Sequence, residues 1–133
     1  QGGAWAGIGV NNTNYIAYCF HSVEGYSKIA TFNGNGNTNG PFVHTGFRPS
    51  WILIKETSDT SNWDIHDKRR PGYNIDNNQL SADENPAEKT NNYLEWFSNG
   101  FKIQTTDGGY NTSGNKYLYM AFAQSPFKTS NAR

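Results

Sequence analysis

The chain has 133 residues, a length that suits one domain, and its 11 Lys and Arg residues balance its 11 Asp and Glu residues. A neutral chain lacks the basic excess that nucleic acids and anionic membrane surfaces attract, and no apolar run is long enough to span a bilayer. The single cysteine, Cys19, excludes an intrachain disulfide. We therefore expect no nucleic-acid partner and no membrane insertion.

Aromatic residues are frequent, at 15% of the chain, while helix-forming Ala, Leu and Met are scarce. Short strand-like runs alternate with turns rich in Gly and Asn. In chain order, we expect strands over residues 4–10, 14–23, 26–32, 41–45, 50–56, 61–66, 79–81, 93–98, 100–106 and 116–124. No segment keeps the apolar spacing of a helix. The pattern predicts an all-β fold, an antiparallel β-sandwich of jelly-roll type, as a single domain over residues 1–133.

Two loops stand out from this pattern. Residues 33–40, with the sequence NGNGNTNG, carry no side chain that could build a core. Residues 67–92 have no clean period of either kind, and we expect a long surface excursion there, which is typical of a functional or mobile loop. Residues 1–13 are interpreted as the remnant of a preceding segment. Between the loops, the Asn99-Gly100 pair predicts a tight hairpin.

The two strongest strand candidates resemble each other. Residues 15–20 read YIAYCF and residues 117–122 read YLYMAF, each after a polar run. Both segments are apolar at every position, so we expect both strands to be central, with both faces covered. Two explanations stay open: two central strands of one domain share a composition, or the first is the last strand of a preceding copy in a tandem repeat.

Groups that could catalyse a reaction are few, so we expect no enzyme. Cys19 and His21 lie on one face of an apolar strand, but a cysteine among aromatic residues is typical of a buried core position. A glycosidase would need two carboxylates at a set separation, and the acids near aromatic residues are Asp64, Glu84, Glu88 and Glu95. Asp64 and His66 alternate with Trp63 and Ile65, which favours a solvated strand face for them.

The candidate ligand-binding residues cluster around a basic run. Arginine forks beside an exposed ring suit an anionic glycan or a phosphate group, although a turn paired with nearby acids explains the same pattern. The candidates are Asp64, His66, Lys68, Arg69, Arg70 and Tyr73. The tyrosines that we expect to be exposed are Tyr73, Tyr93 and Tyr110.

We expect neither a metal site nor a cofactor. The three histidines are widely spaced and form no zinc motif. Calcium held by loop carboxylates is the alternative that the sequence leaves open, with Asp76, Asp83 and Glu84 as ligands.

Five motifs, read together, resemble a family. They are YIAYCFHSVEGYSKI from Tyr15, GNGNTNGPFV from Gly34, TGFRPSW from Thr45, LEWFSNGFKI from Leu94 and YLYMAFAQSPF from Tyr117. Together they are similar to a domain of uncharacterised function in structural proteins of marine bacteriophages, where it is a C-terminal module that often follows a concanavalin A-like lectin domain. The likeness runs from Asn14 to Phe127 and brings no functional residues with it.

The resemblance implies a component of a virion, at its surface, as part of a tail fibre, an adhesin or a decoration. We expect the domain to bind a host-surface glycan or receptor, with the loops at 33–40 and 67–90 carrying recognition. One alternative is a purely structural module that contacts copies of itself, as a homo-oligomer, or other virion proteins. A glycan-cleaving enzyme is the third alternative.

Overall fold

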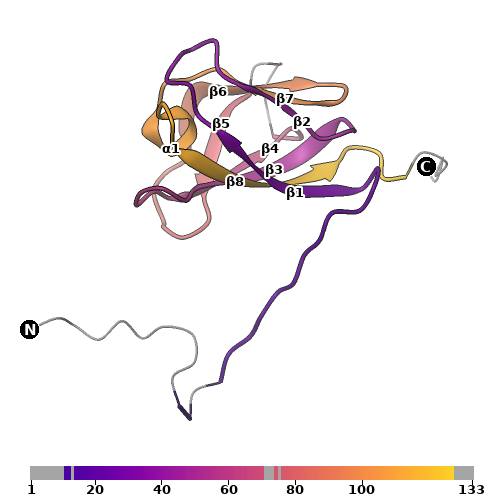
Figure 1. Cartoon of the computed structure of the whole chain (residues 1–133), viewed down its shortest axis with the longest axis vertical. Helices are drawn as coiled ribbons and strands as arrows, with labels where there is room; N and C mark the ends of the chain where they lie inside the picture. Colours follow the sequence, from indigo (N-terminus) through magenta and orange to yellow (C-terminus); the bar gives the residue numbers. More distant parts are fainter. Residues whose placement is uncertain (1–10, 13, 71–73, 75, 128–133) are drawn as a thin grey trace, which may run out of the picture.

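The computed structural model describes residues 11–12, 14–70, 74 and 76–127. These residues form eight antiparallel strands and one helix of a single turn (Figure 1). The strands are β1 (Ser27–Asn33), β2 (Phe42–His44), β3 (Pro49–Glu56), β4 (Trp63–Asp67), β5 (Asp76–Ser81), β6 (Lys89–Phe97), β7 (Gly100–Ile103) and β8 (Lys116–Ala123). The helix α1 spans Gly108–Asn111, directly before β8.

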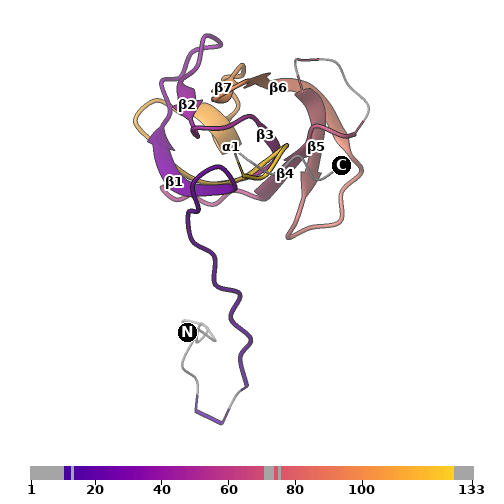
Figure 2. The ribbon, with the colours of Figure 1, turned by 90° about the vertical axis from the view of Figure 1, so that its right-hand side faces the viewer.

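The strands hydrogen-bond in the order β1-β8-β3-β4-β5-β6-β7-β2. This row folds over on itself, so that β1, β8, β3 and β4 face β6, β7 and β2 (Figure 2). Strand β5 makes the turn between the layers, because it pairs with β4 through Ser81 and Leu80 and with β6 through its earlier residues. The predicted sandwich-like all-β fold is confirmed.

Large rings fill the narrow space between the two layers. Phe101 of β7 meets Tyr119 of β8 edge to face, with ring centroids 5.4 Å apart, and Phe32 of β1 stacks on Tyr117 at 5.1 Å. Ile52 and Ile54 of β3 are fully buried beside them, as members of the same core cluster. Six of the twelve buried residues in this cluster are aromatic, so large rings make up much of the core of a chain with few aliphatic residues.

Most of the expected strands exist. The predictions over residues 26–32, 41–45, 50–56, 61–66, 79–81, 93–98, 100–106 and 116–124 correspond to β1 to β8 in order. The predicted hairpin between β6 and β7 is confirmed, although its turn is Ser98-Asn99 and Gly100 is the first residue of β7. The excursion over residues 67–92 holds β5 and the start of β6, and the expected strand at 4–10 lies outside the described residues. The short helix α1 was not expected.

The prediction of a central strand at residues 14–23 is wrong. Residues 14–22 run away from the sandwich as an extended segment without a partner strand (Figures 1 and 2), and we call them the arm. β8 alone of the two similar segments is central, between β1 and β3. Among the described residues, no helix is long and apolar enough to cross a membrane.

Candidate functional site

Strand β4 places two polar side chains inside the sandwich. Asp64 and His66 are buried, whereas Trp63 is exposed and Ile65 is half-buried. The sequence predicted the alternation correctly but assigned the faces the wrong way round, so the expected solvated face for Asp64 and His66 is wrong. The polar pair can face inward because each side chain finds a partner there: the Asp64 carboxylate accepts a hydrogen bond from the Gln79 amide, and His66 Nε2 lies 2.8 Å from the Tyr110 hydroxyl.

Tyr93 and Tyr110 complete a ring cluster around His66. Their ring centroids lie 4.8 Å apart, and the His66 ring lies 5.5 Å from Tyr110. Both tyrosines are almost fully buried, so the expectation that they are exposed is wrong. The cause is the scarcity of aliphatic side chains, which draws tyrosines from loops and strand starts into the core. Tyr73, the third tyrosine of that prediction, lies outside the described residues.

Burial sets the electrostatics of this cluster. Desolvation raises the pKa of the Asp64 carboxyl, and the hydrogen bond from Gln79 and the nearby His66 and Lys89 oppose that rise only in part. Desolvation, reinforced by the Asp64 charge, holds the pKa of the Tyr110 hydroxyl well above its usual value. The site therefore favours a neutral tyrosine and a carboxyl that takes up a proton more readily than an exposed one.

The Asp64 carboxyl borders a polar pocket of about 220 Å³. The residues that line it are Ser61, Asn62, Asp64, Gln79, Lys89, Asp107 and Gly109. Asp107 is the N-cap of α1, and its carboxylate accepts a hydrogen bond from the Gly109 amide at 2.9 Å. Of this lining the sequence had singled out only Asp64 as a site residue. The Asp107-Gly108-Gly109 run could have suggested a capped turn, but no local pattern brings Lys89 or Gln79 to Asp64.

Glu95, another acid of the glycosidase alternative, lies away from Asp64. Glu95 is on β6, where its carboxylate accepts a hydrogen bond from the Gln104 amide at 2.8 Å. It is not among the residues that line the Asp64 pocket, which has Asp107 as its other acid. Because Asp107 already accepts the Gly109 amide, the arrangement suits hydrogen bonding to a polar ligand better than glycoside hydrolysis.

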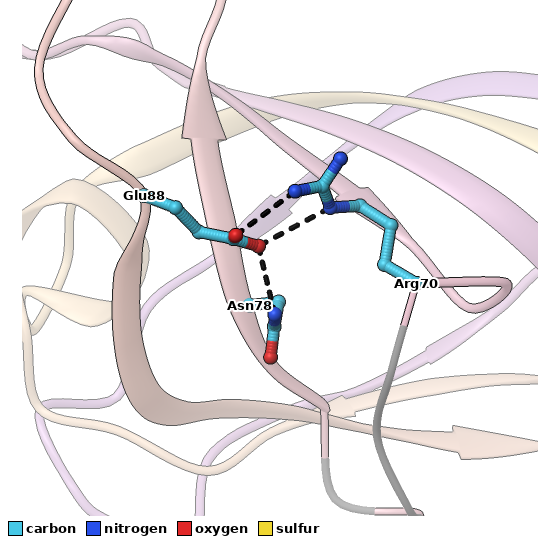
Figure 3. A network of polar contacts seen from close by, with 3 residues as sticks. All are labelled: Arg70, Asn78 and Glu88. Carbon is cyan, nitrogen blue, oxygen red and sulfur yellow. Dashed lines mark hydrogen bonds and ion pairs between the residues drawn. The ribbon is translucent and has the colours of Figure 1, made fainter.

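The basic cluster lies on the turn after β4, and its side chains have different partners. Arg70 forms a two-pronged contact with Glu88, with its Nε 3.2 Å and its Nη2 2.9 Å from the carboxylate oxygens (Figure 3). Asn78 donates to the same carboxylate at 2.7 Å. The hydrogen bond from Arg70 lowers the pKa of Glu88. The guanidinium fork that was expected to bind an anion therefore already holds an acid of the same chain.

The other members of the cluster are separate from that pair. Lys68 Nζ donates to the Gln124 side chain at 2.7 Å, and Arg69 is exposed. Neither residue lines the pocket at Asp64. The six candidate residues thus divide into three groups. Asp64 and His66 are buried, Lys68, Arg69 and Arg70 lie on the turn after β4, and Tyr73 lies outside the described residues.

Two of the acidic residues considered as calcium ligands, Asp83 and Glu84, instead accept hydrogen bonds at the start of β4. The Asp83 carboxylate accepts the Trp63 amide at 3.0 Å, and the Glu84 carboxylate accepts the Asn62 side-chain amide at 3.2 Å. In the described part of the chain, no group of three or more His, Cys, Asp or Glu side chains is placed to hold a metal ion.

The arm carries four of the exposed large hydrophobic side chains in the described part of the chain. Ile16 and Tyr18 are 82% and 81% exposed, and Tyr15 and Phe20 are about half exposed. Cys19 is exposed as well, so the expectation that it is a buried core residue is wrong. The arm touches the sandwich at its root, where the Phe20 ring meets Phe122 at 6.3 Å.

The fold and these two features define a small antiparallel β-sandwich domain with a polar pocket and an apolar arm. Residues 3–126 match the family described as a domain of unknown function, DUF7483, so the chain belongs to that family. Comparisons with curated proteins and with solved structures found no match.

Proposed function

We propose that this domain is a structural module of a virus particle, at the virion surface, and that it joins neighbouring protein through its apolar arm. The observation that carries the proposal is the exposure of Ile16 and Tyr18, which are more than four-fifths accessible in a run of six apolar residues. The viral part of the proposal rests on the resemblance of the five sequence motifs to bacteriophage structural proteins.

The cost of leaving the arm in water supports this proposal. Burying a large apolar side chain contributes roughly 1.5–3 kcal/mol, and the arm leaves several such side chains unburied. Soluble monomers rarely expose contiguous apolar surface without a partner for it. A segment rich in aromatic and β-branched residues is also ready to pair as a strand.

The test compares self-association of the whole chain with that of an arm variant. We expect the 133-residue chain to form species larger than its monomer mass of 14.9 kDa in sedimentation velocity as its concentration rises. The double substitution Ile16→Lys and Tyr18→Lys should shift the chain to monomer, because charged side chains oppose apolar contact. The melting temperature should not change, since both side chains lie outside the core.

A matched variant controls for the added charge. Thr38→Lys with Thr106→Lys places two lysines on exposed loop positions away from the arm. This variant should associate like the unchanged chain. If the unchanged chain stays monomeric throughout, or if both double variants behave alike, self-association through the arm is rejected.

Binding of a host-surface glycan is the second candidate function, and the pocket at Asp64 favours it. Its lining offers amide, carboxyl, hydroxyl and ammonium groups, which match the hydroxyl-rich surface of a saccharide. Lys89 is the exposed cation at the pocket, and its charge acts on Asp64.

Titration with bacterial surface polysaccharides, chosen from a glycan array, tests this second candidate. Lys89→Gln should weaken binding about tenfold, the loss expected for one hydrogen bond to a charged group. Lys116→Gln, an exposed lysine at the start of β8, should bind like the unchanged chain. No signal on the array, or equal binding by both variants, would reject the pocket as a glycan site.

A further inference from the structure

We infer that the arm is the last central strand of a second domain with this fold, where it takes the place that β8 takes here. The inference rests on the proposed function, because it names the partner of the arm. It also decides between the two explanations that the sequence left open for the likeness of residues 15–20 and 117–122.

The turn that precedes each segment is the first support. Asn12 lies three residues before Tyr15 and has φ 58°, and Gly114 lies three residues before Tyr117 and has φ 82°. Few residues other than glycine adopt this left-handed conformation, although asparagine tolerates it. The likeness of the two segments therefore extends from their apolar composition to a left-handed residue three positions before each of them.

The side-chain pattern is the second support. In β8, Tyr117, Tyr119 and Ala121 point into the core and are buried. The matching residues of the arm are Tyr15, Ala17 and Cys19. Each is apolar or weakly polar, so the arm could present the same face to a core.

The opposite face of β8 is also partly covered. Leu118, Met120 and Phe122 are half-buried there. The matching arm residues are Ile16, Tyr18 and Phe20. A strand with two apolar faces needs neighbours on both faces and at both edges, and β8 has strands β1 and β3 at its edges. The arm therefore suits a central position rather than an edge.

Neither outer strand of this sheet, β1 or β2, gives the arm a neighbouring strand on both sides. The first part of the outer edge of β1 already pairs with the segment before it, because Val23 and Ser27 exchange backbone hydrogen bonds of 3.0 and 2.9 Å. The Ser22 hydroxyl then accepts the Ile29 amide at 3.0 Å. At the other end of the sheet, β2 has three residues, which is too short to pair with a strand of six. The arm therefore fits a domain whose β8 position its own chain leaves open.

A joined chain tests this inference. Residues 1–116, carrying Cys19→Ser, are placed directly before residues 15–133, so that the second arm follows β7 and α1 of a first domain as β8 does. Cys19 of that arm is the one thiol of the joined chain and takes the place of Ala121, which is fully buried. Its reaction with a thiol reagent should slow at least about 100-fold relative to the 133-residue chain, because reaction requires opening of the first domain.

A second version of the joined chain avoids a cavity in the core of its first domain. The arm has Ala17 where β8 has the Tyr119 ring, so the joined chain is also made with Ala17→Tyr. This version should keep Cys19 protected and raise the melting temperature of the first domain.

Two outcomes overturn the inference. One is a Cys19 that reacts in both versions as fast as in the 133-residue chain, and the other is a first domain that stays unfolded in both. If sedimentation of the 133-residue chain still depends on Ile16 and Tyr18, the proposed function stands and the β8 position alone is rejected. If that dependence is absent while Cys19 is protected, the proposed function is rejected in its self-associating form.

Discussion

Replacing Asn111 with alanine is expected to lower the free energy of unfolding by about 3 kcal/mol, since several buried hydrogen bonds are lost at about 1 kcal/mol each. Asn111 is fully buried in α1, and its Nδ2 lies 2.7 Å from the Asn37 carbonyl and 2.8 Å from the Thr105 carbonyl. Its Oδ1 accepts the Asn35 amide at 2.8 Å. One side chain thus fastens the Asn-Gly loop between β1 and β2 to the helix.

Denaturant unfolding measures the loss, and hydrogen exchange locates it. The Asn35 amide should exchange faster in Asn111→Ala, because its acceptor is gone. Asn111→Asp is expected to be at least as damaging, since a carboxylate oxygen would face the two carbonyls that now accept from Nδ2. Asn99→Ala, at an exposed position on the β6–β7 turn, is the control and should change stability little. Equal losses in Asn99→Ala and Asn111→Ala would show that the loop is not held in this way.

The same asparagine shows why loops resist prediction. The loop at residues 33–40 was expected from its Asn and Gly content, and residues 34–40 form a loop, while Asn33 ends β1. Its anchor lies far along the chain in α1, a helix of one turn that has too few residues to show a helical period. Local composition therefore located the loop, whereas its stability depends on a contact that no local pattern encodes.

The strands were predictable where local pattern and tertiary pairing agree. β3 and β8 are apolar runs bounded by turn residues, and both lie within the sheet. Residues 15–20 have the same pattern, yet they have no partner strand in this domain. Strand propensity indicates that a segment can pair in a sheet, but it does not identify the strands with which the segment pairs.

The pocket was predictable only in part, for a similar reason. Asp64 drew attention as an acid beside aromatic residues, but its inward direction follows from the Gln79 partner on β5. β5 has the sequence DNNQLS, which lacks clear alternation and was expected only over its last residues. A polar residue can face a core when its partner comes from a neighbouring strand, and single-sequence patterning assigns such residues to solvent.

Gly100→Ala is the second substitution with a large expected effect, a loss of about 3 kcal/mol or failure of β2 to pair. The hairpin predicted at Asn99-Gly100 is present. Gly100 is needed there because β2 approaches it closely, and not because its φ is left-handed. A Cβ on Gly100 would lie 2.2 Å from the Val43 carbonyl oxygen, and that oxygen belongs to backbone that cannot turn aside. Gly100 pairs with His44 across β2 and β7, so the clash falls on the strand pair at the end of the sheet.

Gly108→Ala is the matched control for this substitution. A Cβ on Gly108 would meet the Thr112 hydroxyl at 3.5 Å, an ordinary contact, and Gly108 lies in α1, where alanine is the better helix former. We expect this variant to match or slightly exceed the unchanged chain in free energy of unfolding, by up to about 1 kcal/mol. Thermal melts measure the melting temperatures of both variants. Gly100→Ala should lower the melting temperature, because backbone lies against Gly100, whereas Gly108→Ala should not, because Gly108 has space around it. If both variants melt at the temperature of the unchanged chain, β2 does not hold the close position against β7 that gives Gly100 its role.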